Sequence, residues 1–304
     1  NDYTLDCIKS VLKSDYLNFQ IILIDNGSSE KNFRELIYKA PHDARLIIKR
    51  VEENVGYVGG VNHGLKEASL SNPDFYLVMN NDTLMDDQAI AALVGCAEKH
   101  NRNAIVSGKV YNYDGTDTLQ YIGNVHQNKG TILDSKTLVK KRREEDNGQY
   151  DDEIEMAMLD DIFWIIPDKI YEKIGLYSDY FFLYGEQADY ALRAVKEGFK
   201  LIYTPTAKLW HKGGITTAGG NKESPIVVYW KTFASLKLSV LHMPKKEARK
   251  FYYNLLIRRT IKKLLLVLKG KSSLSVVRAQ FMAIWHFRFW NVIRYKDNGY
   301  NPYR

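Results

Sequence analysis

The chain has little cysteine and no long hydrophobic run, and each absence excludes a class of protein. Its two cysteines, Cys7 and Cys96, are too few for a disulfide framework and lack metal-ligand spacing, which favours reduced thiols in a cytoplasmic protein. The strongest apolar run, Leu264–Leu268, lies between lysines and is far shorter than the ~18 residues of a membrane-spanning helix. The first residues contain no apolar segment of the kind found in a signal peptide.

Proline and glycine are also scarce, with 7 and 20 residues among 304, and the composition is 45% hydrophobic and 26% charged. These values exclude a disordered, collagenous or low-complexity chain. Charge is divided unevenly along the sequence. Residues 231–304 contain 17 Lys and Arg but only 2 Asp and Glu, whereas residues 1–230 contain 26 basic and 34 acidic side chains. The sequence therefore combines an acidic body with a basic C-terminal region.

Strands and helices alternate in the first hundred residues. Apolar runs and turn signals predict strands at 21–25, 45–51 and 75–79, and helices at 29–38, 56–69 and 86–100. This alternation is typical of an α/β fold with a mostly parallel sheet flanked by helices. Ligands of such sheets bind beyond the carboxyl ends of the strands, where Asp25 and Asp82 lie.

The pattern changes in the second half of the chain. Further strands are expected around 105–113, 155–166 and 200–203, with helices at 167–174 and 187–197. From Pro225 onward the pattern is helical, over 227–242, 245–269 and 272–295. We therefore expect an α/β domain over residues 1–224 and a basic helical region over residues 225–304.

Several polar segments follow the predicted strands. Asp82, behind Asn80 and Asn81, suits a hard divalent cation that holds phosphates, although Asn-Asn-Asp is also good turn chemistry. Asp25 has the same alternative in Asp-Asn-Gly-Ser. The glycine-rich segment 54–64 lets backbone amides approach an anion, but its spacing matches neither a dinucleotide fingerprint nor a P-loop.

Two further segments carry acid–base or ligand chemistry. Glu186 and Asp189 stand at a predicted helix start, where a carboxylate can act as a general base or favour the helix N-terminus. His211 follows Trp210 ahead of a glycine-rich loop and is open to a structural or a ligand role.

Taken in order, these segments resemble the family-2 glycosyltransferases with the GT-A fold. The segments are Asp-Asn-Gly-Ser-Ser, Asn-Val-Gly-Tyr-Val-Gly-Gly-Val-Asn, Asn-Asn-Asp, Phe-Phe-Leu-Tyr-Gly-Glu-Gln-Ala-Asp-Tyr-Ala-Leu-Arg and Trp-His-Lys-Gly-Gly. The chain is most similar to bacterial rhamnosyltransferase-like members that build surface polysaccharides, over roughly residues 1–240.

The resemblance implies a role for each matching position. Donor-binding positions would be Asp25, Asn54, Gly56, Gly59, Asn62, Asn80 and Asn81. Asp82 would hold a divalent metal, Mg or Mn, with His211 as a further metal or diphosphate ligand. Asp160 and Asp161 would orient the acceptor or serve as buried polar groups of the strand.

The sequence departs from the family pattern at two places. The family's acidic segment commonly carries the base at its second residue, which is Gln187 here, so Glu186 or Asp189 would take that role, and Glu186 is favoured. The family also begins with a strand ending in Thr-Tyr-Asn, and Asn1 looks like its last residue. The first strand is therefore expected to be missing from the sheet.

The resemblance implies inverting transfer of a sugar from a nucleotide-diphosphate sugar to a glycan or lipid-linked glycan hydroxyl. One alternative is a nucleotidyltransferase that makes sugar nucleotides, although its basic N-terminal glycine loop is not visible. Another is a non-catalytic glycan- or nucleotide-binding homologue with a decayed site, which Gln187 makes plausible. No nucleic-acid module accompanies the basic region, so nucleic acid is not expected as a partner.

The basic C-terminal region mixes positive charge with aromatic and aliphatic residues, such as Trp285, Phe289 and Trp290. This mixture is typical of helices that lie in an anionic membrane interface. The alternative is a helical bundle that packs its apolar face on the catalytic domain and leaves the charges in water. We expect peripheral binding at the inner face of the membrane, with part of the region forming such a bundle.

Overall fold

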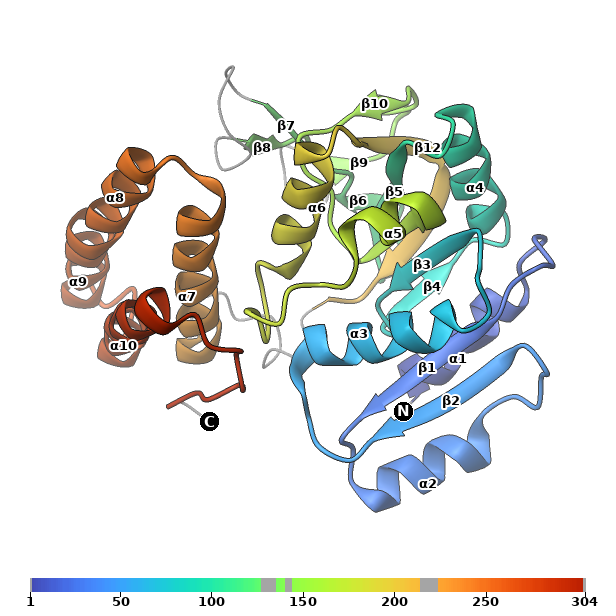
Figure 1. Ribbon diagram of the computed structural model, residues 1–304, viewed down its shortest axis with the longest axis horizontal. Coiled ribbons are helices and arrows are strands. Elements are labelled where there is room, and N and C mark those ends of the chain that lie inside the picture. The colour runs from blue at the N-terminus through green and yellow to red at the C-terminus, as the bar shows by residue number, and fades with distance from the viewer. Residues whose placement is uncertain (1, 127–134, 140–143, 214–223, 303–304) are drawn as a thin grey trace. The chain divides into compact units, whose positions relative to one another are not determined.

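The computed structural model describes residues 2–126, 135–139, 144–213 and 224–302 (Figure 1). The chain forms two compact units. The first unit comprises Asn1–Val55, Gly59–Tyr177 and Tyr190–Gly213, and the second comprises Gly56–Val58, Ser178–Asp189 and Gly214–Arg304. Asn1, on which the expectation of a missing strand depends, lies outside the described residues.

The first half of the chain alternates helices and strands as the sequence predicts, and it also contains a helix at Asp2–Leu12 and a strand at Thr83–Met85 that were not expected. Its elements are α1 (Asp2–Leu12), β1 (Ile21–Asn26), α2 (Glu30–Lys39), β2 (Leu46–Val51), α3 (Gly56–Ser69), β3 (Phe75–Met79), β4 (Thr83–Met85) and α4 (Ala89–Lys99). The expected helix start at Ser29 is confirmed, because its side chain caps α2 by accepting a hydrogen bond from the Asn32 amide at 3.3 Å.

Further strands and two helices follow, and one strand is much longer than expected. They are β5 (Ala104–Asn112), β6 (Thr118–Tyr121), β7 (Asn124–His126), β8 (Ser135–Thr137), β9 (Glu144–Glu145), β10 (Ile154–Glu155), β11 (Phe163–Pro167), α5 (Asp168–Ile174), α6 (Glu186–Lys196) and β12 (Lys200–His211). The predicted strand at 200–203 is too short, since β12 continues through a register shift against β5 to His211.

The main sheet has the order β10-β12-β5-β11-β3, with β4 and β6 attached to β12 and β5. β12 and β5 run parallel, but β11 runs antiparallel to both of its neighbours, β5 and β3. β3, β5 and β12 therefore share one direction, as expected for the α/β class. The expectation of a mostly parallel sheet is wrong in detail, because the inserted β11 and the attached strands make the sheet mixed.

β1 and β2 form a parallel sheet of their own, apart from the sheet that ends at β3. A missing strand would leave such a discontinuity, and the missing strand itself stays a prediction. Both sheets belong to the first unit, and both have helices beside them in Figure 1.

The core of the first unit lies between α4 and the main sheet. Ala89, Leu93 and Ala97 are fully buried at helical spacing on one face of α4 and pack against strand residues such as Phe163 and Leu209. Apolar burial of this kind stabilises a fold by roughly 25 cal/mol per Å². This packing fixes α4 against the main sheet.

The second unit is largely helical. Its C-terminal elements are α7 (Pro225–His242), α8 (Lys245–Tyr253), the π-helical η2 (Asn254–Arg259), α9 (Thr260–Leu268) and α10 (Leu274–Ile293). The single helix expected over 245–269 is thus interrupted by a π-helical segment. α7 and α10 pack around a core that contains Trp230, Phe233 and Trp290. The expected helical bundle is present in this unit.

Candidate active site

Strand register brings Asp82 and His211 together in the first unit. β4 pairs with the last residues of β12, and His211 lies opposite Thr83, the residue that follows Asp82. The Lys212 amide also donates a hydrogen bond to the Asp82 carbonyl at 3.1 Å. Two residues separated by more than a hundred positions therefore meet at one edge of the main sheet.

The His211 ring is oriented by Gln120 on β6. The Gln120 amide nitrogen donates to the His211 backbone carbonyl at 3.0 Å, so its oxygen faces His211 Nδ1 at 2.6 Å. This network assigns the ring proton to Nδ1 and leaves a lone pair on Nε2. Nε2 lies 3.2 Å from Asp82 Oδ1. A neutral ring with its proton on Nδ1 would present Nε2 to the same cation as Asp82 Oδ1, whereas a protonated ring would form an ion pair with the carboxylate.

Asn80 and Asn81 surround this pair in different ways. The Asn80 amide nitrogen lies 3.5 Å from His211 Nε2, and its backbone carbonyl accepts a hydrogen bond from the Thr83 hydroxyl at 2.7 Å. The Asn81 amide donates to Thr4 on α1 at 3.0 Å. Asn80 therefore lies beside the pair, whereas the Asn81 side chain joins the loop to a helix.

Cys7 also approaches this loop, without the character of a ligand. Its thiol lies 3.7 Å from the Asn80 carbonyl and 3.5 Å from the Thr83 hydroxyl. Burial raises the pKa of the Cys7 thiol, and the nearby Asp82 carboxylate adds to the shift. The thiol therefore stays protonated and acts as a weak hydrogen-bond donor.

Asp160 and Asp161 lie at the same edge of the sheet. β11 pairs with β3 so that Phe163 faces Met79, and the Asn80 amide donates to the Ile162 carbonyl at 2.9 Å. Asp160 Oδ1 accepts a hydrogen bond from the Ile162 amide at 3.2 Å, while Asp161 is buried. The register thus places both residues next to the Asn80–Asp82 loop.

Asp25 ends β1 as a buried carboxylate, only 6% exposed. The parallel register sets it opposite Arg50 on β2, whose Nε lies 3.6 Å from Asp25 Oδ2. The Arg50 guanidinium is held by Glu30 and by the Ser28 carbonyl. Among the described residues, Asp25 Oδ2 has no hydrogen-bond partner, which leaves it ready to accept a bond from a ligand.

The loops after β1 and β2 are joined by hydrogen bonds of the Asn26 side chain. Asn26 Oδ1 accepts a hydrogen bond from the Val55 amide at 3.0 Å, and its amide nitrogen lies 3.5 Å from Asn54 Oδ1. Gly27 has φ of 75°, and a Cβ there would lie 2.5 Å from the Asn54 nitrogen. Gly59 is similarly crowded, with Val55 2.5 Å from a Cβ. Only glycine allows this close approach.

Two other predicted donor positions have structural contacts. Asn62 makes two hydrogen bonds to the Tyr177 backbone, at 2.9 and 3.0 Å, so its side chain fastens α3 to that segment. Gly56 begins α3 with φ of 79°, and a Cβ there would lie 2.5 Å from the Phe182 ring. The donor-binding roles of both residues stay predictions.

Glu186 and Asp189 belong to the second unit, in the first turn of α6. Both are buried, and Asp189 Oδ1 lies 2.8 Å from Nε2 of His242 at the end of α7. Tyr184 precedes the helix with φ of 64°, a backbone conformation that residues other than glycine seldom adopt. Such backbone strain often accompanies functional positions.

Three residues of these sites were not singled out from the sequence. Gln120 and His242 lie on elements far from the motifs they support, and no local pattern marks them. Lys212 stands over the Tyr3 ring, with Nζ 3.6 Å from its centroid. Its place directly after His211 was a signal that could have identified it.

Comparison with known proteins decides the family. The sequence model described as "Glycosyl transferase family 2" matches residues 1–175, more than half of the chain. The chain belongs to glycosyl transferase family 2. The predicted family is thus confirmed, and the expectation of a glycosyltransferase is confirmed at the level of that family.

Relatives of this family-2 chain include named bacterial synthases. It is 27% identical over 253 residues to a poly-beta-1,6-N-acetyl-D-glucosamine synthase of Staphylococcus epidermidis, covering 77% of this chain and 55% of that protein. The synthase of the same name from Staphylococcus aureus strain MSSA476 is 29% identical over 167 residues, covering 50% of this chain and 39% of the relative. The chain thus spans about half the length or less of these relatives.

Two solved structures share its fold. GalNAc-T7 with UDP, GalNAc and Mn2+ has a TM-score of 0.58 and 15% identity, covering 94% of this chain and 55% of that one. S. aureus TarS 1-349 in complex with UDP-GlcNAc has a TM-score of 0.54 and 14% identity, covering 94% and 77%. The α/β fold expected from the resemblance is therefore confirmed.

Proposed function

We propose that this protein transfers a sugar from a nucleotide-diphosphate sugar to a hydroxyl of a glycan or lipid-linked glycan, with inversion at the transferred carbon. Membership of the family supports sugar transfer. The arrangement of Asp82 and His211 supports metal dependence, and this single observation carries the proposal.

The residues at this point fit a divalent cation such as Mg²⁺ or Mn²⁺. Neighbouring ligands of an octahedral cation with bonds of ~2.1 Å lie about 3 Å apart. Asp82 Oδ1 and His211 Nε2 are 3.2 Å apart, and Gln120 fixes the tautomer as the outer partner of a ligating histidine usually does. When bound, the cation would supply positive charge to stabilise the leaving diphosphate.

The buried Asp25 carboxylate would accept hydrogen bonds from the nucleobase or ribose of the donor. Its Oδ2 atom and the neighbouring Arg50 Nε both lack hydrogen-bond partners among the described residues. Removing buried polar groups from water without a partner is unfavourable, so a ligand that bonds to them gains affinity. Asn80 would contact the diphosphate beside Asp82, and the start of α3 offers backbone amides for an anion.

Glu186 is proposed as the general base that removes the proton of the acceptor hydroxyl. Asp189 already shares a hydrogen bond with His242, which suits a positioning role. Asp160 and Asp161 would orient the acceptor. The Gln187 amide is not basic enough to accept this proton. The alternative to the proposal is therefore a decayed, non-catalytic site.

The test is release of nucleoside diphosphate from a panel of sugar nucleotides. UDP-N-acetylglucosamine stands first in the panel because the named relatives are poly-N-acetylglucosamine synthases. Asp82→Ala should lower metal-dependent turnover by roughly 10³-fold, since a cation contributes several kcal/mol to transition-state stabilisation. The matched control, Asp87→Ala, changes an exposed aspartate of the following loop and should retain activity.

Three results would contradict the proposal. Equal turnover of wild type and Asp82→Ala with added metal would remove the metal assignment. Failure of the wild-type chain to turn over any donor in the panel, with donor still bound, would favour the non-catalytic homologue. Synthesis of a sugar nucleotide from a nucleoside triphosphate would favour the nucleotidyltransferase.

We also propose that the second unit binds the anionic inner face of a membrane, where a lipid-linked acceptor would lie. One face of α10 carries exposed apolar side chains at intervals of seven, four, four and three residues. They are Leu274, Phe281, Trp285, Phe289 and Val292, between 46% and 80% exposed. Arg278 and Arg288 are exposed on the same face. Apolar residues beside basic ones suit an anionic membrane interface.

Exposed apolar residues also mark the neighbouring helical segments. They are Ile257, Ile261, Leu264, Leu265 and Leu268 of η2 and α9, between 40% and 83% exposed. Within the part of the chain that the structure describes, no helix has both the length and the hydropathy to span a membrane. The proposed mode is attachment at the surface through the exposed apolar side chains of α9 and α10.

A further inference from the structure

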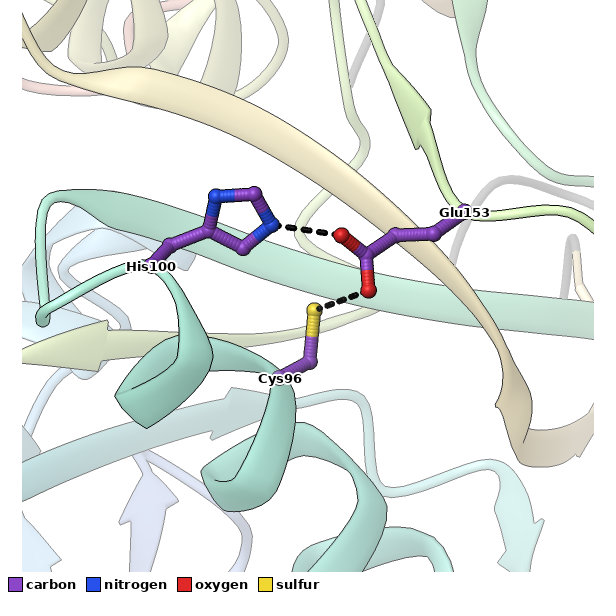
Figure 2. A group of neighbouring side chains, drawn as sticks. All are labelled: Cys96, His100 and Glu153. Carbon is purple, nitrogen blue, oxygen red and sulfur yellow. Dashed lines mark hydrogen bonds and ion pairs between the residues drawn. The ribbon is translucent and has the colours of Figure 1, made fainter.

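A second group of possible metal ligands lies in the first unit, away from Asp82. Cys96 and His100 stand one turn apart at the end of α4, and Glu153 lies just before β10 (Figure 2). β5 starts four residues after His100 and ends at Asn112, which pairs with His211. Its nine residues span roughly 25–30 Å, so the two groups lie at opposite ends of the sheet.

The three side chains converge on one point. Glu153 Oε1 lies 2.5 Å from His100 Nε2, and Glu153 Oε2 lies 3.5 Å from Cys96 Sγ. All three candidate ligand atoms lie within 4.8 Å of one another. In a tetrahedral zinc site, bonds of 2.0–2.3 Å set neighbouring ligand atoms about 3.3–3.8 Å apart. Small side-chain rotations therefore convert this group into three corners of a tetrahedron.

The chemical nature of the donors selects the cation. A thiolate, an imidazole and a carboxylate form a set that zinc favours, whereas hard cations such as magnesium and calcium bind a thiolate poorly. We propose that Cys96, His100 and Glu153 bind Zn²⁺, with a water molecule as the fourth ligand. This proposal does not depend on the glycosyltransferase activity, because none of its ligands belongs to the proposed catalytic or donor-binding groups.

The surroundings show how the site would change on binding. Burial raises the pKa of the Cys96 thiol to about 12, with a smaller contribution from Glu153, so the thiol keeps its proton without a cation. Zn²⁺ would displace that proton to solvent and form the Zn–S bond in its place. The Thr204 hydroxyl hydrogen-bonds to the Cys96 sulfur and would remain as the outer partner of the ligand.

Lys99 competes with the cation for the carboxylate. Its ammonium lies 3.2 Å from Glu153 Oε2, but the side chain is 67% exposed and can turn into water when a metal binds. The competing account is that His100 and Lys99 each form a hydrogen-bonded ion pair with Glu153 and that the group binds no metal. The bound metal would fasten the end of α4 to the segment before β10 and raise the stability of the first unit.

Cobalt is the probe for the thiolate ligand. The metal-free, chelator-treated protein is titrated with Co²⁺, and a thiolate-to-cobalt charge-transfer absorption in the near ultraviolet should saturate at one equivalent. Zn²⁺ should then displace Co²⁺, because it binds nitrogen and sulfur sites more tightly. Cys96→Ser should abolish the band. Cys7→Ser, which changes the other buried cysteine, should leave it intact.

Further variants keep the test decisive if Cys96→Ser fails to fold. Glu153→Gln should weaken Co²⁺ binding more than Thr204→Val, which should cost about tenfold as an outer-sphere change. Asp82→Asn should leave the band unchanged, which separates this site from the proposed catalytic metal. No band in the wild type, or a band that survives both Cys96→Ser and Glu153→Gln, would overturn the proposal.

Discussion

The two units of the chain bury positive charge in different surroundings. In the first unit, the buried Lys109 ammonium lies 2.8 Å from Asp146 and 2.6 Å from Asp151, and the Asp151 side chain is 65% exposed. In the second unit, Lys237 lies 2.6 Å from Asp297, and both side chains are almost fully buried. The first network therefore reaches water, whereas the second is enclosed in an apolar core.

The same contrast holds for the polar and apolar surfaces. The first unit places Asp25, Asp82 and His211 at the ends of strands. The helical region instead exposes leucine, phenylalanine and tryptophan among basic residues and has only 2 acidic residues over 231–304. The difference suggests a division between donor chemistry in one unit and surface binding in the other.

The variant Glu186→Gln tests this division, because Glu186 is the proposed base and belongs to the second unit. If Glu186 is the base, its loss should lower turnover by about 10²- to 10⁴-fold. Donor affinity should stay unchanged, since the base acts on the acceptor. Steady-state rates and direct donor binding, measured on the same preparation, separate these two effects.

Asp189→Asn provides the comparison for the base. It removes the charge beside His242 without removing Glu186. A larger loss of turnover in Asp189→Asn than in Glu186→Gln would assign the base to Asp189. A gain of activity in Gln187→Asp would indicate instead that the natural base position is impaired in this chain.

Lys237→Met would sharpen the comparison of the buried lysines. It leaves Asp297 as a buried charge without its cation, which should lower the free energy of unfolding by about 3 kcal/mol or more. Lys109→Met should have a smaller effect, because Asp151 is exposed to water. Denaturant unfolding of both variants measures the difference.

The double variant Lys237→Met/Asp297→Asn controls for lost packing. Removing the uncompensated charge should recover a large part of the stability lost in Lys237→Met. Similar losses in Lys109→Met and Lys237→Met, with no recovery in the double variant, would show that the enclosed pair has no special energetic role.

Local signals in the sequence were sufficient for most elements of the fold. The strand at Phe75–Met79 and the helix that ends at Ile174 before Gly175 follow from apolar runs and backbone breakers. The insertion of β11 between β3 and β5 was missed, because strand order depends on long-range pairing. The length of β12 was underestimated, since Pro205 resembles a strand end although the strand continues past it.

The candidate site was predictable only in its sequence motifs. Asp82 and His211 were each recognised from their neighbours, but the interaction of His211 with Gln120 depends on the pairing of β6 with β5 and of β12 with β5. The Asp189–His242 pair likewise joins the first turn of α6 to the end of α7. Tertiary contacts such as these leave no spacing pattern in the sequence.

The final prediction concerns the surface that sets the second unit apart. Binding to anionic vesicles should exceed binding to neutral vesicles at low salt and should weaken as salt increases, because each basic residue near the membrane contributes about 1 kcal/mol. Trp285→Ser should weaken binding about tenfold, since the 54% exposed indole loses its apolar contact with lipid. Leu17→Ser, which changes a leucine of the first unit that is 78% exposed, is the matched control and should bind normally. Equal sedimentation with both vesicle types, or equal losses in the two variants, would leave α9 and α10 without a role in membrane binding.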